Sequence, residues 1–284
     1  MAKLTKSKLI SLLVGFTIVL GFSNVHAFNP ATHLFIAQGV FHSQDVDLDY
    51  GSISPDLIFF ADQEKWPTSF EDTHYNYIDL RSYAIGHAQK AFALGWLTHN
   101  ELWGADYYAH RINPIGNNTC INQGYYQGYI IEKACLLSDK AGIDPEFAHF
   151  AVETAIDFLL RSNEDPELGE KLLNASLFRS WFDRNLLAKV LVWKERRTDL
   201  VTLAAAEMSF RNLIGRYAIA LALPSPYNKE ALARLGAEMA LEIYRIEVSQ
   251  EEVLNILDLA ISLCEEDYRD VIYFTINEIR KGLR

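Results

Sequence analysis

The chain has 284 residues, half of them hydrophobic, so it is long enough to bury a sizeable core in one large domain or two small ones. The composition carries no signature of a disordered protein. A formal net charge of −11 gives no general attraction to nucleic acid or anionic lipid, although bound cations would reverse the sign locally.

The first 27 residues have the three parts of a secretory signal peptide. Three lysines precede a largely apolar run over residues 9–22, and a short polar stretch then ends at Ala27. No later stretch offers the roughly 20 apolar residues that a membrane span needs. We therefore expect an exported protein, periplasmic or secreted, whose soluble mature chain begins near Phe28. Removing residues 1–27 takes away three lysines and no acids, which changes the formal charge from −11 to −14.

Hydrophobic residues recur at helical spacing along most of the remaining chain. The pattern predicts helices over residues 30–41, about 81–110 and 145–160, followed by several amphipathic helices from Pro166 to the end. Strand signals are weak, and the sequence contains no internal repeat. These features predict an all-α protein.

Two stretches interrupt the helical pattern. Residues 45–79 are irregular and rich in Asp, Ser and aromatics, and residues 111–129 have the Asn, Gly and Pro content of a long loop. Long loops in helical proteins often carry function. The sequence changes character near residue 165, which separates a domain over residues 28–165 from a helical region over residues 166–284. Packing is the simplest role for that second region, and no motif assigns it another.

Histidines are concentrated in the first half of the chain. Seven follow the predicted signal peptide, and none occurs in the last 135 residues. If residues 81–110 formed one helix, His99, Asp106 and His110 would lie within about 20° of one line. Glu101 would point about 200° away from His99, which favours a solvated charge. The sequence therefore places a stripe of metal-ligand types where core residues are expected.

Four further segments contain candidate ligands, each with a simpler alternative. His149 and Glu153 are four residues apart, so they share a helix face and could chelate one cation or only form a hydrogen bond. Asp56 follows a proline and could be a ligand or a turn cap. His33 and His74 could be ligands or core histidines with satisfied hydrogen bonds.

The three cysteines, Cys120, Cys135 and Cys264, do not have metal-ligand spacing. In an oxidising compartment Cys120 and Cys135 could form a disulfide across the predicted polar loop. The sequence leaves this bond and free thiols equally open.

Taken in chain order, these segments resemble the bacterial zinc-dependent phospholipases C, which share a three-zinc helical fold with fungal single-strand nucleases. The resemblance covers residues 28–153 and rests on "THLF", "SPD", "THY", "GWLTHNELWGADYYAH" and "HFAVE". Two positions depart from the family pattern. Four residues after His99, where the family has a ligand, stands Trp103, so Asp106 is taken from the stripe instead. Phe28 stands where the best-known members begin with tryptophan, but there the main chain would bind.

The resemblance implies about three zinc ions per chain, held by imidazole and carboxylate ligands. The first would be bound by Asp56, His74, His99 and Asp106. The second would be bound by His110, His149 and Glu153. The third would be bound by His33, the main chain of Phe28, and Asp106 as a bridging carboxylate.

The activity that the resemblance implies is that of a phospholipase C acting at a membrane surface. Such an enzyme hydrolyses phospholipids to diacylglycerol and a phosphorylated head group with zinc-activated water, which Asp56 could orient or deprotonate. One alternative is a three-zinc nuclease acting on single-stranded nucleic acid. Another is an exported zinc-binding protein without catalytic activity. Leu57 follows the motif aspartate where some members carry an aromatic residue, so choline specificity is not implied.

Overall fold

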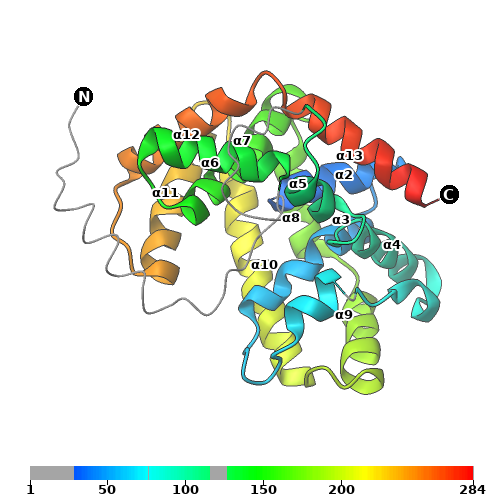
Figure 1. The fold of residues 1–284 in the computed structure, drawn as a ribbon. Coiled ribbons are helices and arrows are strands. Elements are labelled where there is room, and N and C mark those ends of the chain that lie inside the picture. Colours follow the sequence, from blue (N-terminus) through cyan, green and yellow to red (C-terminus); the bar gives the residue numbers. More distant parts are fainter. Residues whose placement is uncertain (1–28, 76, 116–126, 284) are drawn as a thin grey trace.

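The computed structural model describes residues 29–75, 77–115 and 127–283 (Figure 1). Every regular element in these ranges is helical, which confirms the predicted all-α class. The predicted signal peptide, Phe28 and Cys120 lie outside the described residues. Cys135 is disulfide-bonded, and Cys264 is a buried free thiol. None of the described helices is both long and apolar enough to cross a membrane.

The elements follow one another with short connections. Those of the first half are α2 (Pro30–Phe41), α3 (Val46–Ile53), the 3₁₀ helix η2 (Ser54–Phe60), the π-helical turn η3 (Glu71–Tyr75), the 3₁₀ turn η4 (Leu80–Tyr83), α4 (Gly86–Leu97), α5 (Ala105–Arg111), α6 (Tyr129–Ala141) and α7 (Pro145–Asn163). Those of the second half are α8 (Leu168–Phe178), α9 (Trp181–Leu187), the π-helical segment η5 (Ala188–Lys194), α10 (Leu200–Ala222), α11 (Tyr227–Tyr244), α12 (Gln250–Cys264) and α13 (Tyr268–Gly282).

Three predicted helical regions are confirmed. The helix α2 has the predicted bounds, with Pro30 in its first turn, and α7 extends the predicted third helix by three residues. The second half of the chain is a series of amphipathic helices, as expected. One hydrophobic cluster runs from Ala31 to Ile279, so both halves contribute to the same core. In Figure 1, α12 and α13 arch over the top of the molecule, and α10 runs downward from its centre.

The expectation of a long loop over residues 45–79 is wrong, because much of this stretch is helical. The Asp45 carboxylate caps α3 by accepting hydrogen bonds from the backbone amides of Asp47 and Leu48. Gly51 of α3 faces Gly95 of α4 at a crossing where the backbones touch: a Cβ at Gly51 would lie 2.1 Å from the Phe92 carbonyl oxygen. The small and acidic residues that look irregular in the sequence are therefore a helix cap and a close helix crossing.

The expectation of one helix over residues 81–110 is also wrong. The helix α4 ends at Leu97, a loop follows over residues 98–104, and α5 begins at Ala105. The Asn100 side-chain oxygen accepts hydrogen bonds from the backbone amides of Leu102 and Trp103, which ends the helical ladder. The loop is closed by a bond from the Asp106 amide to the His99 carbonyl, at 3.0 Å. Residues seven apart in the sequence thus become direct neighbours, although not through a helical stripe.

Candidate metal centre

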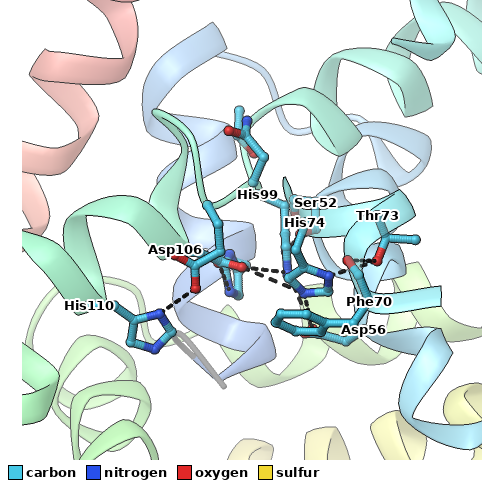
Figure 2. A network of polar contacts seen from close by, with 12 residues as sticks. Ser52, Asp56, Phe70, Thr73, His74, His99, Asp106 and His110 are labelled. Carbon is cyan, nitrogen blue, oxygen red and sulfur yellow. Dashed lines mark hydrogen bonds and ion pairs between the residues drawn. The ribbon is translucent and has the colours of Figure 1, made fainter. Parts of the chain in front are cut away.

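The predicted ligands meet in one buried place, where α2, η2, η3, α5 and α7 converge (Figure 2). All of those described are at least nine-tenths buried except Asp56, whose side chain is 20% exposed. The remaining two histidines are not part of the centre: His42 ends α2, and His87 is 86% exposed. The structure therefore brings together every described residue predicted for the site.

Four ligand atoms define the best-ordered part of the centre. The Nε2 atoms of His74 and His99 lie 3.4 and 3.3 Å from Asp56 Oδ1. The same two nitrogens lie 3.6 and 3.3 Å from Asp106 Oδ2. Four ligands placed tetrahedrally at about 2.0–2.2 Å from a zinc ion are separated by about 3.3–3.6 Å. The four atoms therefore have the spacing of a tetrahedral metal site.

Hydrogen bonds to the second ring nitrogen set the tautomer of both histidines. The Nδ1 atom of His99 lies 2.8 Å from the Ser52 carbonyl oxygen, which can only accept, so Nδ1 carries the proton. The Nδ1 atom of His74 lies 2.7 Å from the Thr73 hydroxyl, whose own proton goes to the Ser69 carbonyl at 3.0 Å. Both rings then direct the lone pair of Nε2 toward the carboxylates. Such outer hydrogen bonds commonly orient metal-binding histidines.

This arrangement requires a positive charge between the rings and the carboxylates. Lone pairs of nitrogen and oxygen that face each other in a buried site repel, and charge-assisted N–H···O contacts would close to about 2.7–2.9 Å. Neither Asp106 oxygen has a hydrogen-bond donor among the described residues, although the residue is 1% exposed. A buried carboxylate without donors is costly unless a cation or a proton neutralises it. The residues present fit a divalent metal ion.

The pKa values describe the same centre when only protons are present. Burial lowers the pKa of His99, but the carboxylates of Asp106 and Asp56 outweigh it and raise that pKa to about 9. Burial raises the pKa of Asp56, but His99 and His74 bring it well below its usual range. Asp106, the most enclosed acid, has a pKa well above its usual range because of burial. The cluster therefore holds protons that a metal would displace.

Asp106 has a second set of neighbours through its other oxygen. Its Oδ1 lies 3.4 Å from His33 Nε2, while Oδ2 faces His74 and His99. The His33 ring stacks on that of His99, with centroids 4.0 Å apart. A carboxylate whose two oxygens face different ligand sets can bridge two ions. Among the described residues, two overlapping groups of ligand atoms, all within 4.8 Å of one another, could hold a metal ion: His33, Asp56 and His99, and His74, His99 and Asp106.

The predicted second zinc site differs from the first in its geometry. His149 Nε2 lies 2.8 Å from Glu153 Oε1, which is the spacing of a hydrogen bond, as the simpler alternative for this pair supposed. The pair is buried and not on the helix surface, and burial raises the pKa of Glu153 to about 7. The His110 ring lies beside that of His149, with centroids 5.5 Å apart. These three side chains are adjacent, but their described contacts are pairwise.

Glu101 corrects the sequence-based interpretation, because it is not a solvated charge. It is 2% exposed, and its Oε1 accepts a hydrogen bond from His110 Nδ1 at 2.6 Å (dashed contacts of the same network are drawn in Figure 2). Its backbone amide also donates to the His74 carbonyl, at 3.0 Å. Burial raises the pKa of Glu101, but His110 more than compensates and lowers it. The loop over residues 98–104 turns this residue inward, which a continuous helix would not do.

Ser52 and Thr73 are further functional residues that the sequence did not single out. Each orients a histidine through a single contact, a backbone carbonyl for Ser52 and a hydroxyl for Thr73. Neither contact leaves a residue-type pattern that sequence spacing could reveal.

The predicted third site is described only in part. Phe28 lies outside the described residues, so its main chain as a ligand stays a prediction. The next residue, Asn29, lies beside the centre, with its side-chain amide 2.9 Å from the Thr154 hydroxyl, next to Glu153 in α7. Comparisons of the chain with protein-family models, with curated proteins and with solved structures gave no match.

Proposed function

We propose that the chain is an exported zinc-dependent phosphodiesterase, and more narrowly a phospholipase C. The observation that carries the proposal is the environment of Asp106. One of its oxygens belongs to a four-atom group with tetrahedral spacing, and the other faces His33. A buried carboxylate between two ligand sets supports a multinuclear centre. Such centres suit phosphodiester hydrolysis better than a purely structural role.

A zinc ion supplies two things to such a reaction: it lowers the pKa of bound water from about 15.7 to about 7, and paired ions stabilise the attacking and leaving oxygens. The chain's own residues hold and orient. His74 and His99 would bind through Nε2, since Thr73 and Ser52 occupy their Nδ1 atoms. Glu101 would orient His110 in the same way.

Asp56 is the ligand nearest to solvent, which supports a role in receiving the substrate water. Its pKa well below the usual range keeps it ionised, because His99 and His74 outweigh the effect of burial. An ionised group of such low basicity orients a water molecule better than it removes a proton from it. We therefore assign Asp56 as a ligand and an orienting acceptor.

A parallel assay would test the proposal. Purified protein is incubated with phosphatidylcholine, phosphatidylethanolamine and single-stranded DNA, each with and without a zinc chelator, and its metal content is measured. We expect lipid hydrolysis that the chelator abolishes and zinc restores. Cleavage of DNA alone would identify a nuclease. Zinc without hydrolysis of any of the three would identify a binding protein, and full activity without metal would end the metal-based mechanism.

A further inference from the structure

A second feature of the molecule lies away from the metal centre, at the junction of α8, α9 and α10. Large hydrophobic side chains are gathered there and are between 46% and 76% exposed. We call this set the apolar surface: Leu177, Phe178, Trp181, Leu200, Val201 and Met208. Contiguous exposed apolar groups of this kind mark interaction sites more often than ordinary protein surface does.

A groove of about 650 Å³ runs through the apolar surface. Leu177, Leu200, Val201 and Met208 line it together with Arg184 and Arg211. Both arginines are held in place: Arg184 forms an ion pair with the buried Glu207, and Arg211 Nε donates to the Ser176 carbonyl at 2.6 Å. The Arg184 guanidinium lies 5.6 Å from the centre of the Trp181 ring. The groove is therefore part of the folded structure.

The charge around the apolar surface is opposite to that of the whole chain. Residues 177–211 contain seven arginines and lysines against four acids, a formal net charge of +3 in a chain of −11. Two of these acids, Asp183 and Glu207, are buried, whereas Lys189 and Arg196 are exposed. The side that faces solvent is thus richer in cations than the count suggests. Such a patch attracts an anionic partner.

We propose that this surface docks the protein onto an anionic lipid bilayer. Exposed tryptophan and phenylalanine flanked by lysine and arginine are the residues that enter the head-group region of a membrane while cations contact lipid phosphates. A second copy of the chain is a poorer partner, because a two-fold contact would set two positive surfaces against each other. The proposal rests on the proposed lipid-directed function for its purpose, although binding can be measured without hydrolysis.

The docking surface is connected to the metal centre through α10. Phe210 of this helix packs against Phe60 of η2, with ring centroids 6.0 Å apart, and η2 also carries Asp56. A protein held by this surface would thus have its most solvent-accessible ligand on an element that packs directly on the docked helix.

The test is co-sedimentation with vesicles of phosphatidylcholine, with and without phosphatidylglycerol. In parallel, hydrolysis of a short-chain phospholipid is measured below its micelle concentration, where no surface is needed. We expect binding to the anionic vesicles that weakens with salt. The variant Phe178→Ser/Trp181→Ser should bind at least tenfold more weakly but hydrolyse the monomeric lipid like the unchanged protein. The matched control is Tyr227→Ser, since Tyr227 is 61% exposed and Trp181 is 62% exposed.

A charge variant makes the test independent of the aromatic residues. Lys189→Glu/Arg196→Glu should lose the preference for anionic vesicles, whereas Lys140→Glu, an exposed change on α6, should keep it. Vesicle binding that both surface variants retain in full would overturn the proposal, as would an unchanged protein that ignores anionic vesicles. Self-association through this surface without lipid binding would also overturn it. Vesicle binding without hydrolysis of any lipid would instead leave the docking surface in place and remove the proposed enzymatic function.

Discussion

The metal centre and the Asp47–Asp183 pair both bury carboxylates, and they neutralise them differently. In the centre, Asp56 and Asp106 face imidazole nitrogens at 3.3–3.6 Å. Asp183, in α9, is completely buried beside Asp47, and neither of its oxygens has a hydrogen-bond partner among the described residues. Burial, reinforced by Asp47, raises the pKa of Asp183 to about 9, so a proton neutralises it. Buried acids alone do not make a metal site; the nitrogen lone pairs directed between them do.

The largest effect should come from removing the shared carboxylate of the centre. Asp106→Asn keeps the shape but removes the charge that faces both ligand sets, so we expect hydrolysis to fall to background and the zinc content to fall from about three ions per chain to about one. Elemental analysis and the lipid assay measure this. His87→Ala, an exposed histidine outside the centre, is the control and should change neither value. Three retained zinc ions would contradict the role assigned to Asp106.

The next change separates the two halves of the centre. His149→Ala or Glu153→Gln should abolish hydrolysis and remove about one zinc ion, while helix content by circular dichroism stays largely intact. The reason is that these side chains contact each other and not the four-atom group. If both variants keep full rates, the pair is only a buried hydrogen bond.

A smaller effect is expected from the residues that orient the histidines. Glu101→Gln replaces the carboxylate that accepts from His110 Nδ1 by an amide, and it should lower zinc affinity or activity about 10- to 100-fold. Thr73→Val removes the hydroxyl behind His74 and should act in the same direction but less, since its acceptor is uncharged. Zinc titration of the two purified variants compares them. Equal wild-type affinity in Glu101→Gln would return this residue to a structural role.

The smallest effect concerns stability at the proton-neutralised pair. The folded-state pKa of Asp183, about 9, exceeds the reference value of 3.8, so the folded protein binds a proton that the unfolded chain releases. Its contribution to stability is complete below pH 3.8 and is lost as the pH rises toward 9. Asp183→Asn should therefore stabilise the protein by about 2 kcal/mol at pH 8 and flatten the pH dependence. Urea denaturation at pH 5 and pH 8 measures this, and zinc content should not change. Destabilisation at pH 8 would mean that the carboxylate itself is required.

Sequence reasoning found the ligands because their chemistry is written in residue types. His33, His74, His99 and Asp106 were selected as nitrogen and oxygen ligands at helical or turn positions, and the fold brings them together. The all-α class followed from hydrophobic periodicity, which depends on local geometry alone. Both predictions used information that is local in the chain.

What could not be predicted depends on contacts between distant segments. The end of α4 is set by the Asn100 side chain and by the bond that closes the loop, so a stripe drawn through an unbroken helix put Glu101 on the wrong side. The helix α3 was missed because its residues are chosen for a close crossing with α4. The orienting contact of Ser52 uses a backbone carbonyl, which any residue type could provide.

The bond from the Asp106 amide to the His99 carbonyl fixes the distance between these two ligands independently of the number of residues between them. The segment that it closes can therefore change length during evolution, like a bead added to a clasped necklace, without moving the clasp. Leu102, half exposed, marks the place where extra residues would be accommodated. A sequence pattern with a fixed interval between histidine and aspartate would pass over chains of this kind, whereas a pattern that allows the interval to vary would recover them. The same segment offers protein engineers a place to insert a reporter next to a metal centre while leaving its ligands in register.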